Sequence, residues 1–297
     1  MLGAIEETGA EALNELGPGL IAGAALGLVV VGAFVLPLRQ AIVGRLLHRS
    51  ELAPAAFRWE DLFAAVALFL VATGVVIPLV GSYVLTGHWQ PDDDAIERLQ
   101  NVGFLGQAIQ TTCAFLVPCL YIGWASMKRS RGAQALGVRS LTPQTIPLGR
   151  TATAIVSFVL GAPFFYGASL MTAAAYGLQG LDVPVQDVAV AISDEIETAP
   201  WRVALFAVVI IPFLEEVLFR GFLLELFRGK LGTVAGVVIS STLFALAHGL
   251  AAAPTIFVLA VVIAVVKLRT RSLFAAWVVH ALNNSTSLFI QSQGLSQ

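Results

Sequence analysis

Residues 231–271 read LGTVAGVVISSTLFALAHGLAAAPTIFVLAVVIAVVKLRTR, and they contain no Lys, Arg, Asp or Glu before Lys267. A helix needs about 20 apolar residues to cross the hydrocarbon core of a bilayer, so the stretch is too long for one span. Gly249 and Pro254 interrupt it in its middle, and such residues favour a break in a helix. The stretch therefore predicts two membrane-spanning helices joined by a turn.

Six further segments predict one span each. Five of them lack charged residues: Gly19–Leu38, Leu62–Pro91, Leu99–Met127, Thr151–Leu181 and Ser272–Gln297. The sixth, Trp201–Phe227, is apolar except for a charged patch in its middle. We expect an all-α, polytopic membrane helix bundle with about eight transmembrane helices, and a short amphipathic helix at residues 3–16.

The composition supports a membrane protein. Apolar residues make up 57% of the chain and charged residues 12%, whereas soluble domains have about 25% charged residues. The net charge of −2 gives no reason to expect a nucleic-acid partner. Cys113 and Cys119 lie in one apolar run, where small buried side chains are a better interpretation than a disulfide or a metal pair.

The distribution of Lys and Arg tests the number of spans, because cytoplasmic loops are enriched in these residues. With eight spans and an external N-terminus, 14 of the 17 basic residues fall in cytoplasmic loops: Arg39, Arg45, Arg49, Arg58, Lys128, Arg129, Arg131, Arg139, Arg150, Arg228, Lys230, Lys267, Arg269 and Arg271. A single span over 231–266 would place the last basic cluster outside. The pattern therefore favours eight spans with both termini on the non-cytoplasmic side. The lack of disulfide or sorting signals fits the cell (plasma) membrane of a bacterium or archaeon.

Ionisable residues inside a span are costly and usually mark function. Residues 210–229, IIPFLEEVLFRGFLLELFRG, place Glu215, Glu216 and Arg220 in the middle of one span. Arg220 follows Glu216 by four positions, so the two can pair on one helix face. Glu215 lies roughly 140° away around the helix and has no local partner, which suits a group that takes and returns protons. The alternative is an ion cluster of all three that ties helices together.

Two histidines join this group. His248 lies at the end of the sixth span, where it could simply sit at the membrane interface. His280 is followed by Asn283 and Asn284 at neighbouring helical positions, and this face should point into the bundle, if only for packing. A carboxylate base, a polar group for a water and donors for an oxyanion are what amide hydrolysis needs. Glu and two His could instead hold a divalent metal such as zinc, although no HExxH motif is present.

The order of these motifs resembles the CAAX prenyl protease and bacteriocin-processing (CPBP) family, also called the Abi family, which includes the type II prenyl endopeptidase that trims prenylated Ras-like proteins. The motifs are EExxxR at Glu215–Arg220, FxxxH at Phe244–His248 and HxxxN at His280–Asn284. The resemblance covers about residues 201–290, and one span without a motif separates the second and third motifs.

The resemblance implies an intramembrane endopeptidase that cleaves a membrane-associated or lipid-modified protein or peptide. It implies that Glu215 is the general base, that His248 assists it, and that His280 and Asn284 stabilise the oxyanion. Supporting roles fall to Glu216, Arg220 and Phe244. The family is often labelled metalloprotease. The resemblance leaves the need for a metal open, and the ligands would then be Glu215, His248 and His280.

We expect one integrated membrane domain in two parts. Residues 1–200 would form an N-terminal acidic segment and four framing helices, and residues 201–297 a four-helix catalytic core. Expected partners are membrane lipids, the substrate and a further membrane partner at the first four helices. Two other functions stay open: a non-catalytic scaffold or immunity protein, and a proton or metal transporter, although no internal repeat of the kind common in transporters is seen.

The depths of the candidate residues pose a question. Counted from the cytoplasmic ends of their spans, Glu215 lies about 12 residues in, His280 about 8 and His248 about 17, a spread of about 14 Å at roughly 1.5 Å per residue. If the three meet, the helices are tilted or offset, or the sixth span starts later in the prediction than in the protein.

Overall fold

The computed structural model describes residues 57–86, 103–128, 148–181, 192 and 195–292. These residues form helices and no strands. Several helices continue into one another, so that seven long rods result. In chain order the rods are α2 (Trp59–Val71) with η1 (Ala72–Val76) and α3 (Ile77–Thr86); α5 (Phe104–Lys128); α6 (Leu148–Gly177); α8 (Pro200–Val203) with η5 (Ala204–Ile210), α9 (Ile211–Glu216), η6 (Val217–Leu223) and α10 (Leu224–Leu231); α11 (Thr233–Ala247); α12 (Ala253–Thr270); and α13 (Leu273–Ser292).

The seven rods correspond to the second to eighth predicted spans. The predicted break is confirmed, because α11 ends at Ala247 and α12 begins at Ala253. Gly249 in the turn has φ +88°, a conformation that glycine adopts without strain. The span expected at Gly19–Leu38 and the amphipathic helix expected at residues 3–16 lie outside the described residues. The fold is a polytopic bundle of helices.

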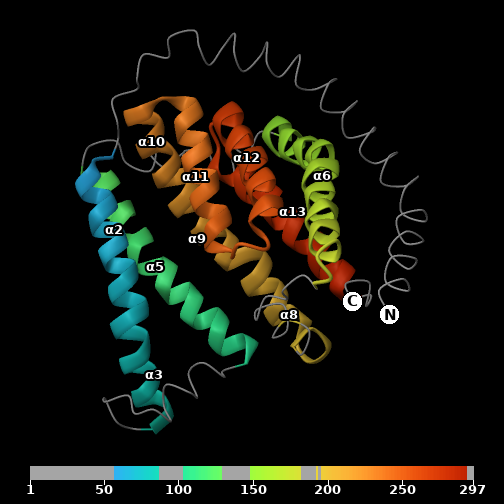
Figure 1. Cartoon of the computed structure of the whole chain (residues 1–297). Coiled ribbons are helices and arrows are strands. Elements are labelled where there is room, and N and C mark those ends of the chain that lie inside the picture. The colour runs from blue at the N-terminus through green and yellow to red at the C-terminus, as the bar shows by residue number, and fades with distance from the viewer. Residues whose placement is uncertain (1–56, 87–102, 129–147, 182–191, 193–194, 293–297) are drawn as a thin grey trace, which may run out of the picture.

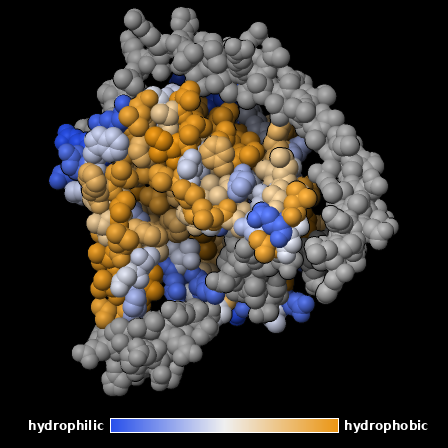
Figure 2. All heavy atoms as spheres, viewed as in Figure 1, coloured by the Kyte–Doolittle hydropathy of each residue, from blue (hydrophilic) through white to orange (hydrophobic). Residues whose placement is uncertain are grey.

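Five helices are long and apolar enough to cross a membrane: Trp59–Val84, Phe104–Lys128, Gly149–Gly177, Ala253–Thr270 and Leu273–Ser292. The rod from α8 to α10 is interrupted by charges, and α11, with 15 residues, is only about 22 Å long. Apolar side chains cover most of the visible surface of the described residues (Figure 2), as expected for a multi-pass membrane protein.

Consecutive rods run in alternating directions, so that helix ends rich in basic residues share one end of the bundle (Figure 1). The starts of α2 and α6 and the ends of α5, α10 and α12 lie at this end, whereas α8 starts at the other end. By the bounds of these helices, the first group carries Arg58, Arg150, Lys128, Lys230 and Arg269, and α8 carries Arg202. The rod from α8 to α10 packs against α5, α11 and α13, and α12 packs between α11, α6 and α13. The charged rod is therefore central to the bundle.

The two cysteines differ in environment. Cys119 is buried and its thiol donates to the carbonyl oxygen of Leu214 at 3.5 Å, as a core side chain should. Cys113 is exposed on α5, so its predicted burial is wrong. The two residues are six positions apart, or roughly 120° around a helix, and only one can face the bundle.

A close approach of α10 and α11 depends on Gly236. A Cβ atom at this position would lie 2.8 Å from the backbone nitrogen of Arg228 and 2.9 Å from its Cα. Backbone cannot yield like a flexible side chain, so Gly236→Ala should destabilise the protein by about 1–3 kcal/mol. Thermal unfolding in detergent measures this. Gly123→Ala in α5, where a Cβ meets no atom within 4 Å, is the matched control; equal melting temperatures for the two variants would contradict the close approach.

Candidate active site

Glu215 lies between two histidines. Its Oε1 is 3.9 Å from Nε2 of His248, and its Oε2 is 3.6 Å from Nε2 of His280. The three residues come from three rods: the end of α9, the residue after α11, and α13. The three side chains therefore converge, and the carboxylate of Glu215 is buried where they meet.

The offset of the helices explains how residues at different predicted depths meet. His248 caps the C-terminus of the 15-residue α11, whereas His280 comes only seven residues after the start of α13. Because α11 begins at Thr233, two residues after the predicted Leu231, a misplaced start is not the reason. The short α11 ends beside Glu215 in the longer rod, and its turn leaves His248 facing the carboxylate.

His248 is oriented by its own helix. Its Nδ1 lies 2.8 Å from the carbonyl oxygen of Phe244, four residues earlier. A carbonyl oxygen only accepts, so Nδ1 carries the proton that is donated and Nε2 faces Glu215. The imidazole packs on the ring of Phe244 at a centroid distance of 4.6 Å. Its side chain is 25% exposed, whereas that of Glu215 is 10% exposed.

Glu216 holds the second histidine. Its side chain is 0% exposed, and its Oε1 accepts a hydrogen bond from Nδ1 of His280 at 2.9 Å. The same oxygen lies 3.3 Å from the NH1 atom of Arg220. The predicted Glu216–Arg220 pair is confirmed. The bond from His280 to Glu216 had no sequence signal, because the two residues are 64 positions apart.

Arg220 and Phe244 form the inner wall. The guanidinium of Arg220 lies 4.2 Å from the ring centroid of Phe244, and its NH2 donates to the carbonyl oxygen of Ala260 at 3.3 Å. The edge of Phe244 meets the ring of His280 at 5.6 Å between centroids. Glu215 forms no ion pair with Arg220 within 4 Å in the described part of the chain, so the three charges of the EExxxR motif do not form one closed ion cluster.

The local helix geometry around the motif is irregular. The π-helical segment η6 starts directly after Glu216, and η5 precedes α9. A π-helical turn is wider than an α-helical turn and is common at functional sites. Here two such segments flank the paired carboxylates, so they set the directions in which Glu215 and Glu216 leave the rod.

Asn284 faces into the bundle, as predicted, and contacts the backbone of the neighbouring rod. Its Nδ2 donates to the carbonyl oxygen of Ala207 at 2.8 Å, and its Oδ1 accepts from Asn283 at 3.2 Å. On the same helix, Nε1 of Trp277 donates to the carbonyl oxygen of Val209 at 3.1 Å. Sequence reasoning missed both contacts with η5. The oxyanion role of Asn284 stays a prediction.

The metal hypothesis finds no geometric support. Among the described residues, no group of three or more His, Cys, Asp and Glu side chains is arranged to hold a metal ion. Glu215, His248 and His280 have the ligand types that zinc takes, but in this conformation they do not form such a group.

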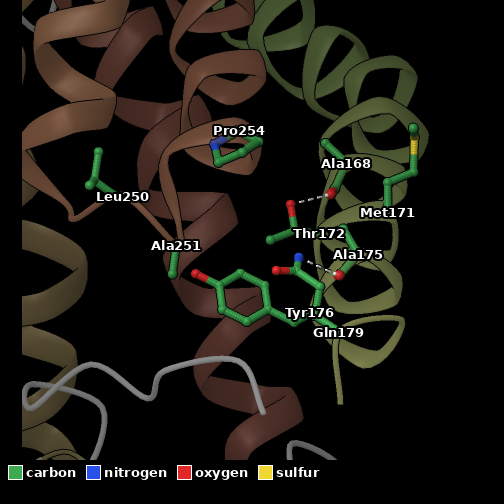
Figure 3. Close-up of a pocket in the computed structure, with 9 residues that line it drawn as sticks. All are labelled: Ala168, Met171, Thr172, Ala175, Tyr176, Gln179, Leu250, Ala251 and Pro254. Carbon is green, nitrogen blue, oxygen red and sulfur yellow. Dashed lines mark hydrogen bonds between the residues drawn. The ribbon is translucent and has the colours of Figure 1, made fainter. Parts of the chain in front are cut away.

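A pocket of about 360 Å³ lies next to the turn that follows His248 (Figure 3). Leu250, Ala251 and Pro254 line one side, and residues of α6 line the other. Thr172 of α6 donates to the carbonyl oxygen of Ala168 at 2.9 Å, and Gln179, in the turn after α6, donates to the carbonyl oxygen of Ala175 at 2.9 Å. Since the lining contains no carboxylate and no imidazole, the titratable groups suited to catalysis lie in the Glu215 cluster and not in this pocket.

Comparison with known proteins identifies one similarity. Residues 197–286 match the model of a family described as type II CAAX prenyl endopeptidase, Rce1-like. The match includes all three motifs and excludes the helices from α2 to α6. No curated protein and no solved structure matches the chain.

Proposed function

From the match of residues 197–286 to the family model of the Rce1-like type II CAAX prenyl endopeptidases, we propose that this chain is an intramembrane endopeptidase. It hydrolyses a peptide bond of a membrane-associated or lipid-modified substrate. The observation that carries the proposal is the buried carboxylate of Glu215 facing Nε2 of both His248 and His280 within 4 Å.

Glu215 and His248 act on the attacking water. Their 3.9 Å separation is too long for a direct hydrogen bond, and a water that contacts both groups is polarised by both. Nε2 of His248 accepts one hydrogen bond from this water, since its Nδ1 proton is donated to Phe244. Glu215 takes a proton from the water as the oxygen bonds to the carbonyl carbon. General-base catalysis of this kind contributes about 10²–10⁴-fold in rate.

His280 acts on the substrate oxygen. In the doubly protonated form of His280, Nδ1 donates a hydrogen bond to the Glu216 carboxylate, which fixes the orientation of the ring as the buried Asp does in serine proteases, and Nε2 carries the second proton. The Nε2 proton then stabilises the oxyanion of the tetrahedral intermediate. When the carbon–nitrogen bond breaks, Glu215 returns its proton to the leaving amine. No step passes through a metal, and zinc held by Glu215, His248 and His280 is the alternative activator.

The proposed setting is the plasma membrane, with both termini on the non-cytoplasmic side. The shared basic end of the rods supports this orientation, because basic residues collect on the cytoplasmic side. The proposed partners are membrane lipids and the substrate, and a further membrane protein would bind at the first four helices. The family name points to a substrate with a prenylated C-terminal CAAX sequence.

His248→Ala tests the proposal directly. The variant should fold and should lose about 10²–10⁴-fold in cleavage rate, because the water loses its second polar contact. The assay uses purified protein in liposomes with a fluorogenic peptide that ends in a farnesylated CAAX sequence, and with the same peptide lacking the farnesyl group.

Leu246→Ala is the matched control, because this side chain is 49% exposed on the same turn of α11 and truncation should leave the rate unchanged. Wild-type cleavage by His248→Ala would contradict the proposed mechanism. A wild-type protein that cleaves neither peptide, nor any other membrane-anchored peptide, would favour a non-catalytic scaffold.

A further inference from the structure

Pro212 creates a gap in the backbone hydrogen bonds of the α8–α10 rod. In η5 the N–H of Ile211 donates to the carbonyl oxygen of Phe206, five residues earlier. The next bond in this register would run from residue 212 to the carbonyl oxygen of Ala207. Residue 212 is proline and has no N–H. Ala207 therefore loses its π-helical donor, while its α-helical donor, Ile211, is directed at Phe206.

The amide of Asn284 supplies the missing donor. Its Nδ2 lies 2.8 Å from the carbonyl oxygen of Ala207, although the two residues are 77 positions apart. A backbone carbonyl without a partner inside a bilayer costs several kcal/mol, so this contact has a strong reason to persist. It joins α13 to the rod at a carbonyl that the proline leaves without its π-helical donor.

A second contact between α13 and η5 comes from Trp277, which precedes His280 along the helix, whereas Asn284 follows it. Nε1 of Trp277 donates to the carbonyl oxygen of Val209, also in η5. Trp277 precedes His280 by three residues, and Asn284 follows it by four. All three side chains project from one face of α13, and all three bond to the α8–α10 rod. Two backbone contacts thus bracket the histidine that bonds to Glu216.

We propose that Asn284 is a positioning residue: its amide replaces the N–H that Pro212 lacks and, together with Trp277, holds α13 so that His280 reaches Glu215 and Glu216. The expected effect of Asn284 on cleavage rests on the proposed function as an endopeptidase. The positioning role differs from the oxyanion role that the family resemblance implies for Asn284, because one of the two N–H groups of the amide is donated to the backbone of the neighbouring rod.

A double-mutant cycle of Asn284→Ala and Pro212→Ala tests this proposal. In the wild-type background, Asn284→Ala leaves Ala207 without a donor and should lower the melting temperature and the cleavage rate. A misplacement of about 1 Å costs about a hundredfold in rate. In the Pro212→Ala background, residue 212 offers its own N–H to the carbonyl, so the loss on adding Asn284→Ala should fall to less than about tenfold.

A third measurement, the NMR signal of the Nδ1 proton of His280, reports on this histidine directly and does not require the protein to cleave a substrate. The chain has four histidines, and ¹⁵N-histidine labelling resolves the Nδ1–H signal that the bond from His280 to Glu216 protects. This signal should disappear in Asn284→Ala and return in the double variant. Because this readout and the melting temperature need no substrate, they decide the positioning role even if the chain proves not to be a peptidase.

The matched control is Pro118→Ala, which removes a helix-interior proline from α5. It restores an N–H far from Ala207, so its effects and those of Asn284→Ala should add. Equal losses from Asn284→Ala with and without Pro212 would overturn the proposal and indicate a direct role at the oxyanion. A His280 Nδ1–H signal that persists in Asn284→Ala would overturn it as well.

Discussion

Glu215→Gln is expected to abolish measurable peptide cleavage while the protein stays folded. The glutamine has nearly the same shape but cannot take a proton from water, so the rate should fall by about 10²–10⁴-fold or more. The effect should appear in kcat, with KM little changed, because proton removal occurs only in the chemical step. Single-turnover cleavage in liposomes, together with a thermal unfolding curve, separates loss of chemistry from loss of folding.

Glu197→Gln provides the matched control. Glu197 is an exposed carboxylate just before the same rod, and its substitution should leave both the rate and the stability unchanged. Retention of full activity by Glu215→Gln would remove the general base from the mechanism. Proton or metal flux across liposomes that depends on Glu215, without any cleavage, would instead support the transporter alternative.

The helices and their breaks could be predicted because each rests on local information. The turn between α11 and α12 follows from Gly249 and Pro254 in a stretch too long for one span. The Glu216–Arg220 pair follows from a spacing of four residues. The order of the motifs singled out Glu215, His248 and His280 as candidates, and the structure brings the three side chains together.

The contacts between helices could not be predicted in the same way. The bond from His280 to Glu216 and that from Asn284 to Ala207 depend on the rotation and depth at which α13 packs. A polar residue in a span shows only that its face points inward, and not which partner it meets. The sequence shows only that Pro212 has no N–H; the carbonyl that lacks this donor and the residue that replaces the donor both required the structure.

Removal of either partner from the Glu216–Arg220 pair should have the largest effect on stability. Arg220 is 1% exposed and Glu216 is 0% exposed, so Glu216→Leu leaves a guanidinium charge buried with the oxygen of Ala260 as its remaining hydrogen-bond acceptor. Breaking a buried ion pair from one side costs about 3–5 kcal/mol. Unfolding in detergent mixtures should show this loss for Glu216→Leu and for Arg220→Met.

The pair of Arg202 and Glu195 is the control. The side chain of Arg202 is 40% exposed and the two atoms lie 2.9 Å apart. Exposed pairs contribute about 0–1 kcal/mol, so Arg202→Met should change stability far less than Arg220→Met. Comparable losses of stability from Arg202→Met and Arg220→Met would show that burial does not determine the cost of breaking the Glu216–Arg220 pair.

The double variant Glu216→Leu with Arg220→Met separates stability from catalysis. Apolar side chains in place of a buried ion pair are often neutral or stabilising, so the double variant should recover most of the stability that each single variant loses. It should not recover activity, because His280 loses the carboxylate that accepts its Nδ1 proton. If cleavage returned together with stability, the pair would serve packing alone. Persistent inactivity in a stable protein would assign Glu216 to the orientation of His280, the role its 2.9 Å contact supports.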